Sequence, residues 1–106
     1  MQKTSERKRT KLPRDVVKAK KFLKDFERLS NSGKHDMNIL KEAMMLLIAN
    51  DFPLPAEWKD HALKGDAKGV RECHIKGDLL LMYRTEDETS DDLITFMRIG
   101  THSEIF

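Results

Sequence analysis

Three of the four histidines lie in the last half of the chain, among other side chains that can move protons or bind phosphate. They are His61, His74 and His102, and Asp78 and Arg98 lie between them in the sequence. Histidine titrates near neutral pH and can act as an acid or a base, whereas the arginine guanidinium stays charged. Together they provide what phosphodiester cleavage without a metal requires: proton acceptors, proton donors and a cation that stabilises the transition state.

The length and composition limit the chain to a small domain. It has 106 residues, 39% hydrophobic and 36% charged, and we expect residues 1–106 to form one domain. No apolar run approaches the roughly 18 residues that cross a bilayer, and the cationic N-terminus lacks the apolar segment of a secretory signal. Cys73 is the single cysteine, which suits a reducing compartment and leaves no thiolate pair for zinc. We therefore expect a cytoplasmic protein without a membrane segment, bound metal or other cofactor.

Charge is distributed unevenly along the chain. Residues 1–34 contain 12 Lys and Arg but only 4 Asp and Glu, whereas residues 35–106 contain 8 and 14. Such a cationic segment suits an RNA backbone or an acidic partner protein. It is also typical of a solvated helix face that follows a frayed end.

Hydrophobic periodicity predicts two helices in the first half of the chain. The first follows Pro13 and ends at residues 31–33, which read Asn-Ser-Gly. Asp36 is placed to cap the second helix, and His35 before it is predicted to be exposed. The two helices should form a hairpin. Their apolar stripes are Val16, Ala19, Leu23, Phe26 and Leu29 in the first helix, and Ile39, Leu40, Ala43, Met44, Leu47 and Ile48 in the second.

From Gly69 onward the hydrophobic period is two, which predicts a sheet. Residues 51–68 form an irregular connection in which Trp58 is expected to pack into the core. The predicted fold is α+β, with the helical hairpin packed on one face of a small antiparallel sheet and the other face free for a site. The predicted strands, arranged as a meander, are Val70–Ile75, Leu79–Arg84 and Leu93–Ile99.

With these elements in place, the sequence resembles the RelE/ParE superfamily of bacterial toxins, and within it the YafQ-type ribosome-dependent mRNA interferases. Members of the family have a first strand before the helices, whereas residues 1–12 here are strongly polar, so we interpret them as a flexible segment or an edge strand. The resemblance is carried by residues 36–38, 54–65, 68–74, 78–83 and 98–106.

The resemblance implies a toxin that enters the ribosomal A site, cuts the messenger RNA there and is neutralised by a cognate antitoxin. Lys59, Arg71 and Phe106, which lie in the matching segments, are expected to bind the substrate. The family pattern places functional residues at six positions, each with the expected residue type here: His61, His74, Asp78, Arg98, His102 and Phe106.

On this pattern, His102 is predicted to donate a proton to the leaving 5′-oxygen. Either His61 or His74 is predicted to take the proton of the ribose 2′-hydroxyl while the other positions the substrate, and the sequence leaves that choice open. Asp78 lies just beyond the turn after His74, where its carboxylate can orient the imidazole. A buried histidine with satisfied hydrogen bonds is the alternative for His74.

Arg98 alternates with Ile94 and Phe96 along the last predicted strand, which would place its charge on a mostly apolar face. An arginine there needs an anion. The anion is either a phosphate of the substrate or a neighbouring carboxylate.

Three other functions compete with this hypothesis. A metal site built from the histidines and Asp78 is disfavoured because the intervals between histidines, 13 and 28 residues, lack the short paired spacing usual for ligands. A ParE-like toxin that inhibits DNA gyrase without catalysis is the main rival. A module that only docks on RNA through its basic helix is the third. Neither of these last two gives the histidines a role.

Overall fold

The structure, a computed structural model, describes residues 12–50, 53–63, 69–85 and 93–106. None of the described helices is long and apolar enough to cross a membrane. In chain order the elements are β1 (Asp15–Lys18), α2 (Lys20–Ser32), α3 (Met37–Ala49), the short 3-10 helix η1 (Ala56–Trp58), β2 (His61–Ala62), β3 (Val70–Lys76), β4 (Leu79–Thr85), β5 (Leu93–Thr101) and α4 (His102–Ile105).

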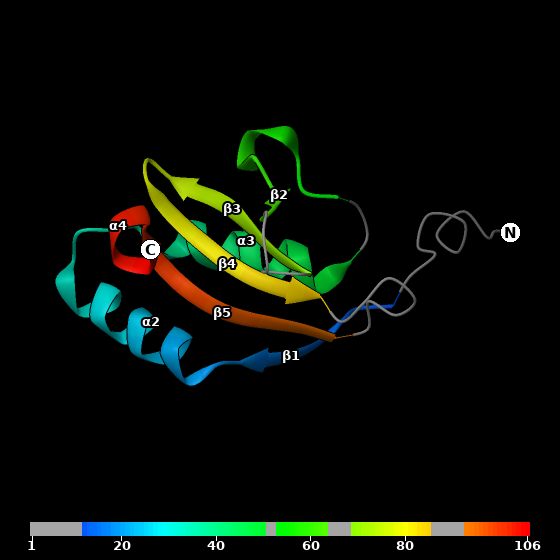
Figure 1. Ribbon diagram of the computed structural model, residues 1–106, viewed down its shortest axis with the longest axis horizontal. Helices are drawn as coiled ribbons and strands as arrows, with labels where there is room; N and C mark the ends of the chain where they lie inside the picture. The colour runs from blue at the N-terminus through cyan, green and yellow to red at the C-terminus, as the bar shows by residue number, and fades with distance from the viewer. Residues whose placement is uncertain (1–11, 51–52, 64–68, 86–92) are drawn as a thin grey trace, which may run out of the picture.

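The strands form one sheet in the order β1-β5-β4-β3-β2. Strands β3, β4 and β5 make the predicted antiparallel meander, and β2 adds to the β3 edge with His61 opposite Glu72. Strand β1 lies parallel to β5 at the other edge. Helix α3 lies behind the sheet and α2 runs along its β5 side, so one sheet face stays open (Figure 1). The predicted α+β fold, with a helical hairpin on one face of the sheet, is confirmed.

The predicted start of the first helix is wrong, because residues 15–18 form β1 instead. Val16 and Val17 are β-branched and favour a strand, and pairing with β5 outweighs the helical spacing of Val16. Helix α2 begins only at Lys20 and ends, as predicted, at Gly33, whose φ of 69° suits a residue without a side chain. Residues 1–11, predicted as an edge strand or flexible segment, lie outside the described residues.

The core fills the space between the helices and the covered face of the sheet. The Phe22 ring contacts those of Phe96 and Phe26, with centroids 5.7 and 6.0 Å apart. Trp58 is buried in this cluster, as predicted. The other buried members are Leu29, Leu40, Ala43, Met44, Leu47, Cys73, Ile75, Leu79, Leu81, Tyr83, Ile94 and Ile99.

A β-bulge in β5 changes which side chains face the open side of the sheet. Met82 of β4 pairs with Arg98, but the next residue, Tyr83, pairs with Phe96, so Met97 is an extra residue in the strand. Directly opposed residues share a face, which puts Arg98 with Met82 on the open face. The expectation that Arg98 shares the apolar face of Phe96 is therefore wrong, because the bulge interrupts the alternation.

Candidate active site

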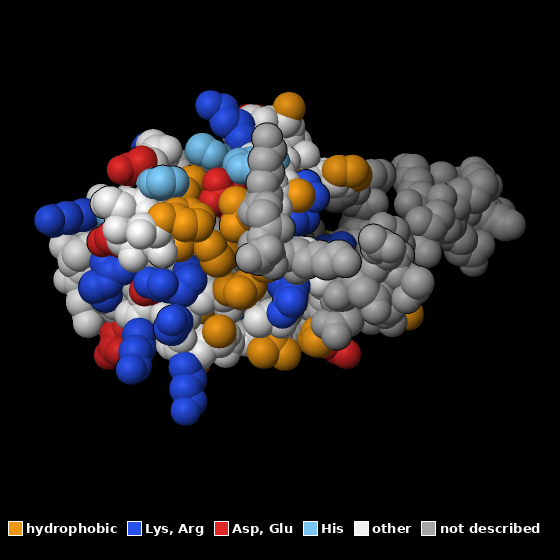
Figure 2. Space-filling view, viewed as in Figure 1, with side chains coloured by type: hydrophobic (Ala, Val, Ile, Leu, Met, Phe, Trp, Pro, Cys, Tyr) orange, Lys and Arg blue, Asp and Glu red, His pale blue; other side chains and the backbone are white. Residues whose placement is uncertain are grey.

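The open face of the sheet carries a cluster of two histidines and a glutamate. Glu72 and His74 alternate along β3 and so point to the same side, and His61 of β2 lies opposite Glu72. The His61 Nε2 atom is 3.0 Å from Glu72 Oε2, and the His61 and His74 rings lie 6.1 Å apart. Figure 2 shows the histidine side chains of this face close together, next to hydrophobic and acidic groups.

The contacts of His61 fix the position of its protons. Its Nδ1 atom is 2.8 Å from the backbone carbonyl oxygen of Lys59, which can only accept, so Nδ1 carries a proton. Nε2 then faces a carboxylate oxygen at hydrogen-bonding distance. That contact is favourable only if a second proton lies between the two atoms, on the imidazole or on the carboxyl group. The His61–Glu72 contact is therefore a charge-assisted hydrogen bond when that proton is present.

Glu72 is the site residue that the sequence analysis missed. Its side chain is buried, and its Oε1 atom is buried without any hydrogen-bond partner. An unpaired buried carboxylate oxygen costs free energy, and a catalytic role or a bound ion or water is a common explanation for one. The available signal was its alternation with His74 on the same strand, but a glutamate in a strand is commonly a solvated residue.

Asp78, predicted to orient His74, makes no hydrogen bond to that imidazole. It is exposed in the turn between β3 and β4 and makes no hydrogen bond or ion pair with another described residue. The carboxylate that the structure does place beside an imidazole is Glu72.

The same cluster has the geometry of a metal site. One ligand atom from each of His61, Glu72 and His74 lies within 4.8 Å of the others. The intervals between the histidines do not reveal this arrangement, because the pairing of β2 with β3 joins residues that are distant in sequence. Imidazole and carboxylate ligands of this kind suit zinc, copper or other first-row transition metals.

Arg98 lies against Asp25 of helix α2. Its Nε donates to Asp25 Oδ2 at 2.7 Å and its Nη2 to Oδ1 at 3.3 Å, while the backbone N–H of Ile99 donates to Oδ2 at 3.1 Å. Burial by itself raises the pKa of Asp25, but the hydrogen bonds from Arg98 and Ile99 outweigh it and lower that pKa below its ordinary value. Of the two anions left open for Arg98, the carboxylate is the one seen, and three guanidinium N–H groups remain for another anion.

Helix α4 presents His102 at its start and Phe106 just after its end. Thr101 and Glu104 cap the helix reciprocally, and Glu104 also pairs with Arg28 of α2 at 2.9 Å. The two exposed aromatic rings of His102 and Phe106 lie 4.8 Å apart. The capped helix therefore holds the imidazole of His102 against the ring of Phe106.

Gly100 allows α4 to fold back on the end of β5. A Cβ atom at this position would lie 3.0 Å from Oε1 and 3.4 Å from Cβ of Glu104. Gly100 has no positive φ, so the glycine serves the close approach of Glu104 rather than a left-handed backbone.

Lys59 and Arg71 differ in their relation to the cluster. Lys59 is exposed, and its carbonyl contacts His61. Arg71 alternates with Glu72 and so faces the helix side, where its Nε donates to Asp60 Oδ1 at 3.3 Å. The Tyr83 hydroxyl donates to the same oxygen at 2.6 Å. Arg71 and Tyr83 thus fix Asp60, the residue that precedes His61.

Two further residues have no part in the site. Burial raises the pKa of the Cys73 thiol to about 12, so it stays protonated and is not a nucleophile. His35, predicted to be exposed, is half-buried.

The chain is similar to known toxins over nearly its whole length. Residues 14–106 match the family described as bacterial toxin of type II toxin–antitoxin system, YafQ. The mRNA interferase toxin YafQ of Escherichia coli strain K12 is 41% identical over 95 residues, which cover 90% of this chain and 98% of that protein.

Solved structures agree with this similarity. The crystal structure of the E. coli DinJ–YafQ complex matches with a TM-score of 0.77 and 42% identity, covering 88% of this chain and 98% of that one. A metal-bound toxin from Helicobacter pylori matches with a TM-score of 0.75 and 39% identity, covering 87% and 98%. The resemblance predicted from the sequence is confirmed.

The Asp25–Arg98 pair predicts acid sensitivity of the fold. Because the folded-state pKa of Asp25 is lowered, its stabilisation is complete above the unfolded value of about 4 and is lost as the pH falls through the folded value. The free energy of unfolding, measured by urea titration, should therefore fall below about pH 4. Asp25→Asn should be less stable at neutral pH and lose less in acid.

Asp78→Asn is the matched control, since Asp78 is exposed and has no partner among the described residues. It should keep the parental pH dependence. An Asp25→Asn protein with the parental acid slope would show that other carboxylates are responsible.

Proposed function

Because the chain belongs to the YafQ family of bacterial toxins of type II toxin–antitoxin systems, we propose that it is an endoribonuclease that cuts messenger RNA in the ribosomal A site. Cutting there inhibits translation, and a cognate antitoxin restrains the activity. The proposed substrate places the protein in the cytoplasm. The single observation that carries the proposal is the cluster of His61, Glu72 and His74 on the open face of the sheet.

The geometry favours His74 as the base. Both nitrogens of His61 are occupied, one by the Lys59 carbonyl and one by Glu72, whereas His74 makes no hydrogen bond with a described residue. His74 is half-buried and therefore reachable, unlike the buried free oxygen of Glu72. His74 is thus free to take the proton of the ribose 2′-hydroxyl. Glu72 acts as a positioning residue that holds the charge and orientation of His61 next to it.

Residues of β5 and α4 carry out the remaining steps of the proposed reaction. The 2′-oxygen attacks the adjacent phosphorus, and negative charge grows on the phosphoryl oxygens, where the free N–H groups of Arg98 stabilise it. His102, in its protonated form, gives its proton to the 5′-oxygen as the P–O bond breaks. The products are a 2′,3′-cyclic phosphate and a 5′-hydroxyl. Phe106 and Lys59, both exposed, are placed to stack on a base and to bind a backbone phosphate.

A gyrase inhibitor or a passive RNA-docking module has less support. Neither function uses the contact between His61 and Glu72, and neither explains an unpaired carboxylate oxygen in the interior. Family membership points to YafQ toxins.

Cutting should depend on the ribosome. The histidines and Arg98 lie on an open sheet face, with little surface to orient a flexible RNA, so the ribosome must provide that positioning. Primer extension should show cuts within codons on messenger bound to ribosomes with a vacant A site, and much slower cutting of the same RNA free in solution. Equal rates on both substrates would contradict the proposal, and cleaved DNA after induction would favour gyrase as the target.

Variants of the proposed site should cut RNA more slowly but still bind the ribosome. Arg98→Ala and His102→Ala remove interactions that strengthen in the transition state, so each should lower the single-turnover cutting rate by roughly a hundredfold or more, with ribosome affinity nearly unchanged. Glu72→Gln should also slow cutting and alter its pH profile, since the amide cannot share the proton. His35→Ala, outside the site, serves as the control with parental activity. A His102→Ala protein that cuts at the parental rate would rule out its role as the acid.

A metal-free mechanism makes a separate prediction. Toxin treated with a chelator and then freed of it should cut normally when added to ribosomes kept in Mg²⁺. If instead activity is lost and zinc or copper restores it, the His61–Glu72–His74 cluster is a metal centre. Glu72→Gln, which removes one ligand, should then raise the metal concentration needed for rescue.

A further inference from the structure

An exposed arginine lies at one end of the open face of the sheet, beyond the residues proposed to cut RNA. Arg84 belongs to β4 and pairs in register with Val70 of β3 and Thr95 of β5. Met82, two residues earlier on β4, is opposite Arg98. Side chains two residues apart on a strand share a face, so Arg84 lies on the same face as Met82 and Arg98.

The guanidinium of Arg84 is available for an anion. The side chain is exposed, and Arg84 makes no hydrogen bond or ion pair with another described residue. By contrast, Arg71 donates to Asp60, and Arg98 donates to Asp25. Figure 2 shows that Lys and Arg side chains share the open face with the histidines. A guanidinium keeps its charge at physiological pH and binds phosphate through paired N–H groups, so Arg84 can hold an RNA phosphate there.

The side chain of Arg84 leans toward β3. A Cβ atom at Gly69, the residue before that strand, would lie 4.0 Å from Cγ and 3.9 Å from Nε of Arg84. Strand β3 carries Glu72 and His74 on the open face. The stem of Arg84 thus lies beside the start of β3, which keeps the guanidinium on the histidine side of the sheet.

The register of β4 with its two neighbours defines three successive rows of residues on the open face. The first row, at Leu80, contains His74 and lies at the end of the sheet where α4 begins (Figure 1). The second row, at Met82, contains Arg98. The third row contains Arg84. A strand rises roughly 3.4 Å per residue, so consecutive rows are about 7 Å apart.

The proposed reaction gives the RNA a direction along these rows. In that reaction His74 takes the 2′-proton of one nucleotide, and His102 gives a proton to the 5′-oxygen of the next. The next nucleotide therefore lies toward α4, which begins at His102. The attacking nucleotide and the RNA on its 5′ side then extend the other way, from the row of Arg98 toward the row of Arg84.

We propose that Arg84 binds the phosphate on the 5′ side of the attacking nucleotide, an inference that rests on the proposed function. Arg98 and Arg84 then hold two consecutive phosphates from adjacent rows, and basic side chains that follow the backbone in this way are how proteins hold an extended single strand. Phosphate contacts position a nucleic acid without reading its sequence. The attacking nucleotide is fixed between two cations, which keeps its 2′-hydroxyl near His74.

An internal ion pair is the alternative role for Arg84. Residues 86–92, which follow β4, contain five acidic side chains and lie outside the described residues. An ion pair with one of them would contribute to folding and not to RNA binding. The two roles therefore differ in whether the effect of changing Arg84 depends on the charge of one RNA phosphate.

The test is a double-mutant cycle between the toxin and ribosome-bound messenger. One synthetic messenger has a natural backbone, and a second carries an uncharged methylphosphonate in place of the phosphate 5′ of the attacking nucleotide. Arg84→Ala should lower kcat/KM about tenfold on the natural messenger, as expected for loss of one charge-assisted hydrogen bond. On the methylphosphonate messenger it should change kcat/KM less than about twofold, because the contact is already lost.

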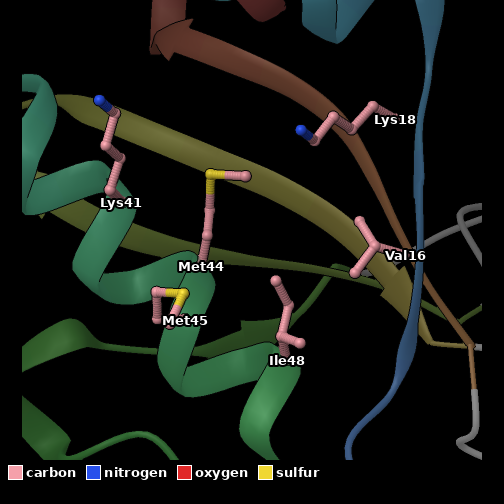
Figure 3. Close-up of a pocket in the computed structure, with 6 residues that line it drawn as sticks. All are labelled: Val16, Lys18, Lys41, Met44, Met45 and Ile48. Atoms are coloured by element: carbon pink, nitrogen blue, oxygen red, sulfur yellow. The ribbon is translucent and has the colours of Figure 1, made fainter.

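Lys41→Ala is the matched control. Lys41 is an exposed cation that lines the groove between β1 and α3 on the helix-covered side of the sheet, away from the histidines (Figure 3). This variant should match the parental toxin on both messengers. Arg84→Lys, which keeps the charge but not the paired N–H groups, should recover part of the kcat/KM that Arg84→Ala loses on the natural messenger.

The outcomes separate failure of this phosphate contact from failure of the proposed function. A folded Arg84→Ala protein with the parental kcat/KM overturns the contact and leaves the ribonuclease proposal intact. An equal loss on both messengers also overturns it and assigns Arg84 to the fold. If the effect disappears only with a methylphosphonate on the 3′ side of the cut, the RNA runs in the opposite direction and the inference is wrong. Absence of cutting by the parental toxin would overturn the proposed function and this inference with it.

Discussion

The buried carboxylate of Asp25 is the contact on which the geometry of the open face most depends. It joins three parts of the fold: α2 carries it, β5 reaches it through Arg98 and the Ile99 N–H, and Arg28 links it to Glu104 of α4. Strand β1 pairs with β5 only as far as Phe96. Beyond that residue, the Asp25 carboxylate accepts a hydrogen bond from the Ile99 N–H at the edge of β5. Without that carboxylate, a free N–H and a mobile guanidinium would lie next to the helix that carries His102.

Alternation along the strands places structural side chains on the helix-covered face of the sheet and the proposed catalytic side chains on the open face. On β3, Cys73 and Arg71 face the helices while Glu72 and His74 face the open side. The inner set supports the outer one, because Arg71 and Tyr83 fix Asp60 and thereby the next residue, His61. Burial raises the pKa of the Tyr83 hydroxyl, as does its hydrogen bond to Asp60, so it remains a donor at any physiological pH. Side chains on the helix-covered face thus help to position the His61 imidazole on the open face.

The sequence predicted the elements whose pattern is local and missed those that tertiary pairing creates. The three meander strands and the second helix follow from hydrophobic period, and Trp58 from its size. Residues 15–18, which form β1, were predicted as helix because the spacing of Val16 fits a helical period as well as a strand period. Strand β2 has only two residues, too few to show a hydrophobic period. The bulge at Met97 has no signature in the sequence. Glu72 entered the site only through the β2–β3 register, which no single-chain pattern determines.

The two imidazoles of the histidine cluster differ in their contacts, although both lie on the open face of the sheet. Nδ1 of His61 donates to the Lys59 carbonyl, and its Nε2 lies 3.0 Å from Glu72 Oε2. His74, in contrast, makes no hydrogen bond with a described residue. This difference in hydrogen-bond partners, one imidazole held and one without a described partner, is what motivates the different roles proposed for His61 and His74.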